Sequence, residues 1–157
     1  MAEQPAAVAR DALDPDTRWQ VSEVLSRYGH IVDSQEWAYL DQVFTPDASL
    51  DAQGRPAVHG LAGIRQFLEP SDPWRSHHTL NTATRWLGGG GEISAWSRFL
   101  VVEAAGTTIS GDYVDVLTPT ADGWRIRSRR ISLRNRAGQA PDGQPWRTES
   151  FSTWTAE

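Results

Sequence analysis

The sequence predicts an α+β fold in which N-terminal helices pack on a strongly curved antiparallel sheet. The N-terminal part of the chain repeats apolar residues at the three- and four-residue spacing of amphipathic helices. The C-terminal part contains long runs rich in Thr, Val, Ile and aromatic residues, separated by turns that contain glycine. When helices are followed in the sequence by a meander of strands, the strands form a sheet and the helices cover one of its faces. A strongly curved sheet forms a cone around a pocket, lined by every second residue of each strand.

Three helices are expected before the strands. The first spans residues 17–32, and the second follows at once over residues 37–44, each with one apolar face. Prolines and a glycine in residues 45–56 break helicity and leave room for one short strand. A short third helix over residues 60–70 is stopped by the proline at its end.

Four strand-like runs follow the helices and are expected to form the sheet. They are residues 77–87, 92–104, 107–119 and 123–135. The predicted domain therefore spans residues 17–135. A flexible lead-in at residues 1–16 precedes it, and the Pro- and Gly-rich tail at residues 136–157 is not expected to join the core.

Composition restricts the class of function. The chain of 157 residues has the length of one ordinary domain, and its formal net charge of −5 argues against nucleic acid or an anionic membrane as partner. The absence of cysteine excludes disulfides, thiolate chemistry and Cys-type zinc or iron–sulfur sites. The chain has no membrane-spanning stretch and no signal-peptide pattern at its N-terminus. We therefore expect a cytoplasmic protein without nucleic-acid or membrane partners.

Metal, phosphate-loop and serine-hydrolase sites are not expected either. The spacing of Asp47, Asp51, Asp112 and Asp115 matches no metal-binding loop. The four glycines at residues 88–91 lack the Lys-Ser/Thr of a phosphate loop. The sequence contains no Gly-x-Ser-x-Gly nucleophile elbow.

Three stretches, taken together, resemble a known family. They are "RYGHIVDSQEWAYLDQVFTPDASLD", "SHHTLNTATRW" and "GDYVDVLTPTADGWRIRSRRIS", in this order within residues 17–135. They resemble the SnoaL-like branch of the NTF2-like superfamily, and within it scytalone dehydratase and bile-acid 7α-dehydratase. The resemblance implies a cone-shaped barrel with a deep apolar pocket, assembled as a homodimer or homotrimer, that needs no metal or organic cofactor. Members include dehydratases, isomerases, cyclases, epoxide hydrolases and non-catalytic subunits, so the fold narrows the chemistry without deciding it.

The resemblance also assigns residues. The catalytic aspartate of the dehydratases falls on Asp33 and the histidine of their dyad on His77 or His78. The tyrosine five residues before the aspartate of the bile-acid enzyme falls on Tyr28. Scytalone dehydratase has different residues at the positions of Val32, Ala52, Glu103 and Tyr113. Scytalone itself is therefore not the expected substrate.

Only one of the two adjacent histidines can enter the cone, because neighbouring strand residues point to opposite faces. His77 shares its face with Thr79 and Asn81, a polar set suited to a site, and the His-x-x-x-Asn spacing also favours it. His78 shares its face with Leu80, and counting back from "TRW" in the family pattern favours His78. We take His78 as the first candidate and His77 as the second; ordinary structural roles for both are the alternative.

Asp33 lies at the end of the first expected helix, where the helix dipole disfavours a carboxylate. A carboxylate beside an imidazole orients the ring and stabilises its cation. The imidazole could then remove a proton next to a carbonyl or protonate a leaving hydroxyl, worth about 10²–10⁴-fold in rate, while Tyr28 hydrogen-bonds the enolate oxygen. The alternative is structural: "DSQE" fits a capping box with Asp33 as N-cap and Glu36 at N3 of the second helix, and Tyr28 packs in the core.

Six further residues are expected to contact the substrate. They are the aromatic residues Trp37, Phe44, Trp96 and Tyr113 and the polar residues Asn81 and Arg129. For Arg129, an ion pair at an interface is the alternative role. Aromatic walls suit a small apolar organic substrate, an oxygenated ring compound such as a polyketide, steroid or terpenoid intermediate. We expect a cofactor-independent lyase or isomerase of the dehydratase or cyclase type; a non-catalytic binding or accessory subunit of the same fold is the alternative.

Overall fold

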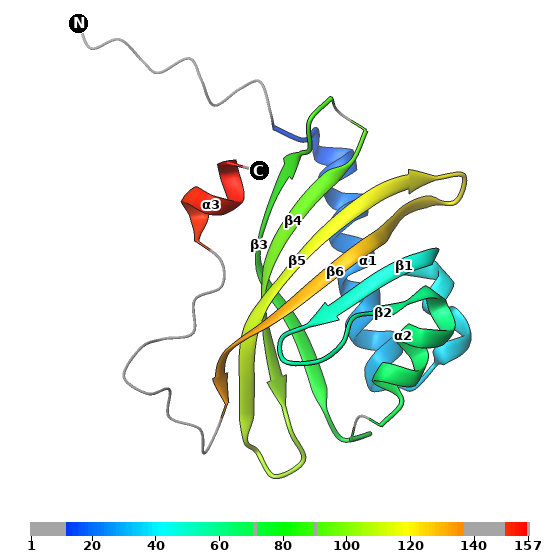
Figure 1. The fold of residues 1–157 in the computed structure, drawn as a ribbon, viewed down its shortest axis with the longest axis vertical. Coiled ribbons are helices and arrows are strands. Elements are labelled where there is room, and N and C mark those ends of the chain that lie inside the picture. The colour runs from blue at the N-terminus through cyan, green and yellow to red at the C-terminus, as the bar shows by residue number, and fades with distance from the viewer. Residues whose placement is uncertain (1–11, 71, 90, 137–149, 157) are drawn as a thin grey trace, which may run out of the picture.

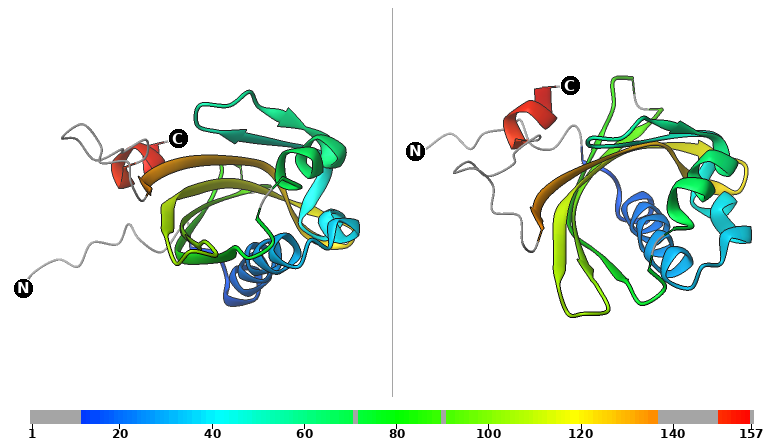
Figure 2. Two further views of the ribbon diagram at one scale, coloured as in Figure 1. Left: turned by 90° about the horizontal axis from the view of Figure 1, so that it is seen from below. Right: turned by 60° about the horizontal axis from the view of Figure 1, so that its bottom comes forward.

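A six-stranded, strongly curved sheet wraps around the N-terminal helix (Figure 1). The computed structural model describes residues 12–70, 72–89, 91–136 and 150–156. Seen along the strands, the sheet forms an arc whose concave side faces helix α1 (Pro15–Asp33) (Figure 2). The α+β class and the curved sheet covered by helices are therefore confirmed.

Local chemistry explains where the first helix begins. The carboxylate of Asp14 accepts a hydrogen bond from the Thr17 amide at 3.0 Å and caps α1, and Pro15 occupies its first turn. Helix α2 (Gly60–Leu68) matches the third expected helix, and α3 (Phe151–Ala156) is a short helix in the tail. Within the described ranges, no helix is long and apolar enough to cross a membrane.

The second expected helix is present in part, as a shorter helix of the 3-10 type. Its first residues form only a six-residue 3-10 helix, η1 (Trp37–Gln42), and Phe44 already begins strand β1 (Phe44–Ala52). Pro46 disfavours the helical conformation for Thr45 and so favours the extended strand there. The segment expected to hold one short strand therefore contains most of a nine-residue strand.

The strands pair in the order β2-β1-β6-β5-β4-β3. Besides β1 they are β2 (Val58–His59), β3 (Ser76–Trp86), β4 (Ile93–Val102), β5 (Thr108–Thr120) and β6 (Gly123–Arg136). Neighbouring strands are antiparallel except β1 and β6, which run parallel and add one parallel pair to the expected antiparallel sheet. A bulge interrupts the β3–β4 register between Leu80 and Ala83.

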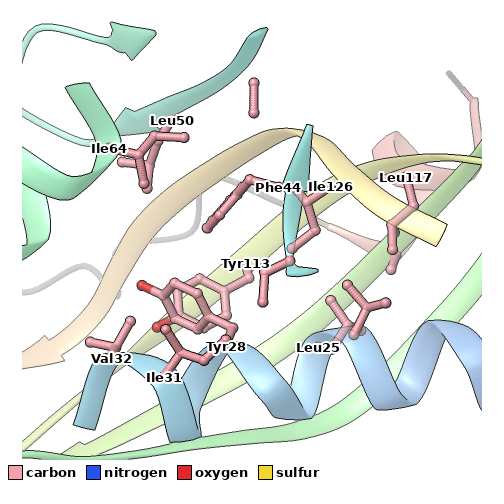
Figure 3. Packing of buried hydrophobic residues seen from close by; sticks show 14 of the residues in the cluster. Leu25, Tyr28, Ile31, Val32, Phe44, Leu50, Ile64, Tyr113, Leu117 and Ile126 are labelled. Atoms are coloured by element: carbon pink, nitrogen blue, oxygen red, sulfur yellow. The ribbon is translucent and has the colours of Figure 1, made fainter. Parts of the chain in front are cut away.

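The core lies between α1 and the concave face of the sheet (Figure 3). From α1 it receives Leu25, Tyr28 and Ile31, which meet Phe44 of β1 and Tyr113 of β5. These apolar positions follow the helical spacing of the sequence on one side and strand alternation on the other.

One residue of the tail packs on the sheet outside the core cluster that lies against α1. Trp154 of α3 is only 3% exposed, and its indole Nε1 donates to the Ser94 hydroxyl at 2.9 Å. The neighbours of Ser94 on both sides, Ile93 and Ala95, belong to the core, so Ser94 and Trp154 lie on the opposite, convex face of the sheet.

Gly111 of β5 occupies a position without room for a side chain. A Cβ there would overlap the Ser132 carbonyl oxygen and approach Cε1 of Phe99 to 2.5 Å. We expect Gly111→Ala to lower the free energy of unfolding by about 1–3 kcal/mol, as overpacking does, measured by urea denaturation. Gly88→Ala is the matched control, because no heavy atom lies within 4 Å of its Cβ position. Equal stability of the two variants would contradict the expected clash.

Candidate functional site

A carboxylate–imidazole pair joins α1 to β3. Oδ1 of Asp33 lies 2.5 Å from Nδ1 of His77, and Oδ2 accepts the His77 backbone N–H at 2.8 Å. Because an ionised carboxylate can only accept, Nδ1 carries the proton in this contact, and Nε2 is the nitrogen that remains for a ligand. Both oxygens of Asp33 therefore hold one residue in one orientation and one tautomer.

His77, and not His78, is the histidine that meets Asp33. His77 lies opposite Val101 in the sheet register, and Val101 points into the core. His78 points the other way, and its Nε2 lies 3.1 Å from the Ser76 hydroxyl at an exposed position. The sequence-based preference for His78 is corrected by this geometry.

Asp33 does not form the capping box. Helix α1 continues through Asp33, its C-cap is Ser34, and Glu36 at the start of η1 makes no side-chain cap. The carboxylate therefore lies at a helix C-terminus, where the dipole disfavours it. The two N–H groups of His77 offset that cost.

A glycine sets the distance between α1 and β3. A Cβ on Gly29 would lie 3.0 Å from the carbonyl oxygen of His77. Gly29 precedes Asp33 by four residues, so both lie on the same face of the helix. The missing side chain lets α1 come close enough for the short side chain of Asp33 to reach His77.

Burial has the largest effect on the pKa of the His77 imidazole. The His77 side chain is 11% exposed, and this burial lowers the pKa of His77 below its ordinary value. The hydrogen bond and the charge of Asp33 oppose the shift without reversing it. His77 is therefore neutral at pH 7, which is the form that accepts a proton.

His77 lines a pocket of about 240 Å³ inside the cone. Apolar side chains make up much of the wall, among them Phe67 of α2, Phe99 of β4 and Ile109 of β5. Tyr28 also lines it, so one wall presents an imidazole and a phenol to the same space. Apolar side chains that share a pocket with several converging polar groups are typical of small-molecule sites.

Two buried tyrosines lie beside the imidazole. The Tyr28 ring centroid is 6.1 Å from that of His77 and 5.7 Å from that of Tyr113, in edge-to-face arrangements. Figure 3 shows the hydroxyls of Tyr28 and Tyr113 toward the same end of the core. Burial raises the pKa of Tyr28 and Tyr113, so both phenols keep their protons at pH 7 and can donate hydrogen bonds.

Arg129 was expected to contact substrate, but it does not line the pocket. Its side chain is 0% exposed and donates Nε and Nη2 to the two oxygens of Asp115 at 2.7 and 2.9 Å. Its guanidinium carbon lies 4.0 Å from the ring centroid of Tyr28 and 4.2 Å from that of Tyr113. Burial alone would lower the pKa of Arg129, but Asp115 raises it above its ordinary value, so the pair is ionised. Arg129 therefore supports the tyrosines rather than the ligand.

Of the other expected substrate contacts, only Tyr113 lines the pocket. Phe44 is fully buried, with its ring centroid 6.0 Å from that of Tyr28, and Trp37 packs against the core from η1. Trp96 lies on the convex face, where its Nε1 donates to Asp112 at 2.9 Å.

Asn81 lies in the bulge of β3, exposed and at a φ of 50°. The bulge interrupts the side-chain alternation, so Asn81 does not share the face of His77 as the sequence spacing suggested.

Asp33 and His77 also border a groove on the outer side of the molecule. This groove runs between α1 and β3 and includes Gly29, His30 and His78. Asp33, which is 24% exposed, does not line the inner pocket, whereas His77 lines both spaces. His77 therefore stands in the wall between them.

Three polar residues at the pocket, Gln53, Arg55 and Arg75, were not predicted from the sequence. For Arg75 a signal existed, because it precedes His77 by two residues and strand alternation would put both on one face. Arg55 lies in the turn after β1, where periodicity carries no information about direction.

Two of the four aspartates whose spacing matches no metal-binding loop, Asp112 and Asp115, bind arginines. Asp115 is occupied by Arg129, and Asp112 accepts from Arg98 and Arg134 as well as from Trp96. Throughout the part of the chain that the structure describes, no three His, Cys, Asp or Glu side chains gather as metal ligands would.

The chain is similar in sequence to a known protein family and in fold to solved structures. Residues 15–130 match the model of the SnoaL-like domain family. None of the curated proteins matches the chain. Among solved structures, ActVI-ORFA from Streptomyces coelicolor is 26% identical, with a TM-score of 0.65 over 75% of this chain and 97% of that one.

Two more distant structures show the same fold. An NTF2-like protein with a cystatin-like fold from Novosphingobium aromaticivorans is 20% identical, with a TM-score of 0.67, and the match covers 80% of this chain and 85% of that one. A candidate scytalone dehydratase from the same species is 17% identical, with a TM-score of 0.66 over 82% of this chain and 100% of the other.

Proposed function

Because the chain belongs to the SnoaL-like domain family, we propose that it is a cofactor-independent lyase or isomerase of the dehydratase or cyclase type. The observation that carries the proposal is the Asp33–His77 pair, whose imidazole lies in the wall of the pocket. The candidate scytalone dehydratase among the structural neighbours is compatible with this reaction class.

His77 is the proposed proton-transfer residue. In a dehydration, its Nε2 removes a hydrogen next to a carbonyl, and the electron pair left on carbon forms an enolate. The enolate then expels the hydroxyl on the neighbouring carbon, which takes the proton from the imidazolium and leaves as water. Asp33 acts as a positioning residue, since it fixes the tautomer of His77 and stabilises the imidazolium.

Tyr28 is the proposed donor to the substrate oxygen. It lines the pocket beside His77 and is protonated at neutral pH, so it can hydrogen-bond a carbonyl oxygen as negative charge develops there. The wall of aromatic and aliphatic side chains supports an oxygenated ring compound such as a polyketide, steroid or terpenoid intermediate as substrate.

An NMR titration of the histidine rings tests the pair without a substrate. We expect His77 to titrate below about 6.5, because burial lowers its pKa. In Asp33→Asn the pKa of His77 should fall further, because the contact that raises this pKa loses its charge. If His77 is the base, kcat/KM rises as pH increases through the pKa of His77. The acid limb of the pH profile of kcat/KM therefore moves to lower pH in the variant. The His78 signal is the internal control, since its ring contacts Ser76.

A His77 signal that ignores the Asp33 substitution would contradict the proposal. The alternative would then be a non-catalytic binding or accessory subunit of the same fold, in which Asp33 only ties α1 to β3 through the His77 backbone N–H.

A further inference from the structure

The polar residues that line the pocket are unequal in charge. Arg55 and Arg75 both contribute to the lining, and no aspartate or glutamate side chain is found among its described lining residues. The chain as a whole has a formal charge of −5, so this local excess of positive charge is not a general property of the surface.

The two arginines differ in how their charge is used. Nη2 of Arg75 donates to Glu103 at 2.9 Å, whereas its Nε is buried without a hydrogen-bond partner. The guanidinium of Arg55 lies 5.2 Å from the ring centroid of Phe67 and has no carboxylate partner among the described residues. Arg55 therefore supplies uncompensated charge, and Arg75 supplies an unused N–H donor.

The pocket combines guanidinium groups with apolar side chains. Phe67 contributes to both, because it stacks under the guanidinium of Arg55 and is itself an apolar lining residue. Guanidinium groups match the planar geometry of a carboxylate, and an aromatic ring beneath one holds it in place at little entropic cost. An isolated buried N–H such as Nε of Arg75 is costly unless a ligand accepts from it.

From these contacts we infer that the natural ligand carries a carboxylate, held by Arg55 and Arg75, on an apolar ring body that reaches His77. This inference rests on the proposed function and specifies its substrate class, an apolar ring acid rather than a neutral ring compound. The carboxylate fixes the position of the ring body, which then lies against the imidazole and Tyr28 in the same pocket.

Matched pairs of probes test the inference by binding alone. Calorimetry would compare benzoate with benzamide and 2-naphthoate with 2-naphthamide, since each pair has nearly the same shape and differs in charge. We expect the better-fitting carboxylate to bind at least about tenfold more tightly than its amide at low salt. Its binding should also shift the His77 ring signal in NMR, which locates the probe in this pocket.

Arg55→Met and Arg75→Met should each reduce this preference to about twofold or less. Arg18→Met, which removes the same charge from an exposed position outside the pocket, should leave it unchanged. Equal binding of acid and amide, binding that does not move the His77 signal, or no binding of any probe would overturn the inference. None of these outcomes bears on the Asp33-dependent titration of His77, so the two proposals can fail separately.

Discussion

Asp115→Asn should lower the free energy of unfolding by about 3–5 kcal/mol, the cost of leaving one member of a buried ion pair without its partner. Arg129 is 0% exposed and directs two N–H groups at Asp115, while its third nitrogen, Nη1, already lacks a hydrogen-bond partner. Asparagine keeps the shape of the aspartate but removes the charge that keeps the guanidinium stable in the core. Urea denaturation of the wild type and the variant measures the difference.

A surface ion pair in the same sheet provides the control. Arg127 of β6 donates to Glu92 at 2.6 Å, and its side chain is 48% exposed. Glu92→Gln should cost at most about 1 kcal/mol, because solvent screens such pairs. The double variant Asp115→Leu with Arg129→Met should recover much of the lost stability, since it removes both buried charges. A cost for Asp115→Asn as small as that for Glu92→Gln would contradict the buried-pair interpretation.

His77→Gln should reduce kcat/KM by about 10²–10⁴-fold, whereas His78→Gln should leave it within about twofold of the wild type. Glutamine can still donate to Asp33, but it cannot take and return a proton at the place of Nε2. The two histidines are adjacent in β3, yet only His77 meets Asp33 and lines the pocket. The measurement is turnover of a ring substrate found by screening dehydration and isomerisation reactions.

Circular dichroism and urea denaturation of both histidine variants would separate lost chemistry from lost folding. A large loss of kcat/KM in His78→Gln would contradict the assignment of proton transfer to His77. An unchanged kcat/KM in a folded His77→Gln variant would contradict it as well. The adjacent pair is a sensitive control because both substitutions change the same residue type in the same strand.

The elements that could be predicted are those with a long, uninterrupted period. Helix α1 repeats its apolar residues over several turns, and the long strands are separated by glycine turns. The expected helix over residues 37–44 spans only about two turns, too short a pattern to tell a 3-10 helix from an α-helix or to locate the start of β1. The burial of Trp154 could not be predicted, because it depends on which sheet face a distant tail reaches.

In the candidate site, the sequence predicted the aspartate and the pair of histidines, while the bulge in β3 decided between them. Counting back from "TRW" crosses the bulge between Leu80 and Ala83, and one extra residue moves the count to the other face. The His-x-x-x-Asn spacing favoured His77, which is the residue that meets Asp33. Its argument from side-chain alternation does not hold, however, because Asn81 lies in the same bulge. The pairing of Arg129 with Asp115 depends on strand register, which periodicity does not encode.

The position of His77 between the pocket and the outer groove gives the two members of the Asp33–His77 pair different surroundings. A ligand that fills the pocket leaves the Asp33 carboxylate in contact with solvent on the groove side. Asp33 therefore keeps its hydration on the groove side while a ligand covers Nε2, and this carboxylate need not be desolvated for the ligand to bind.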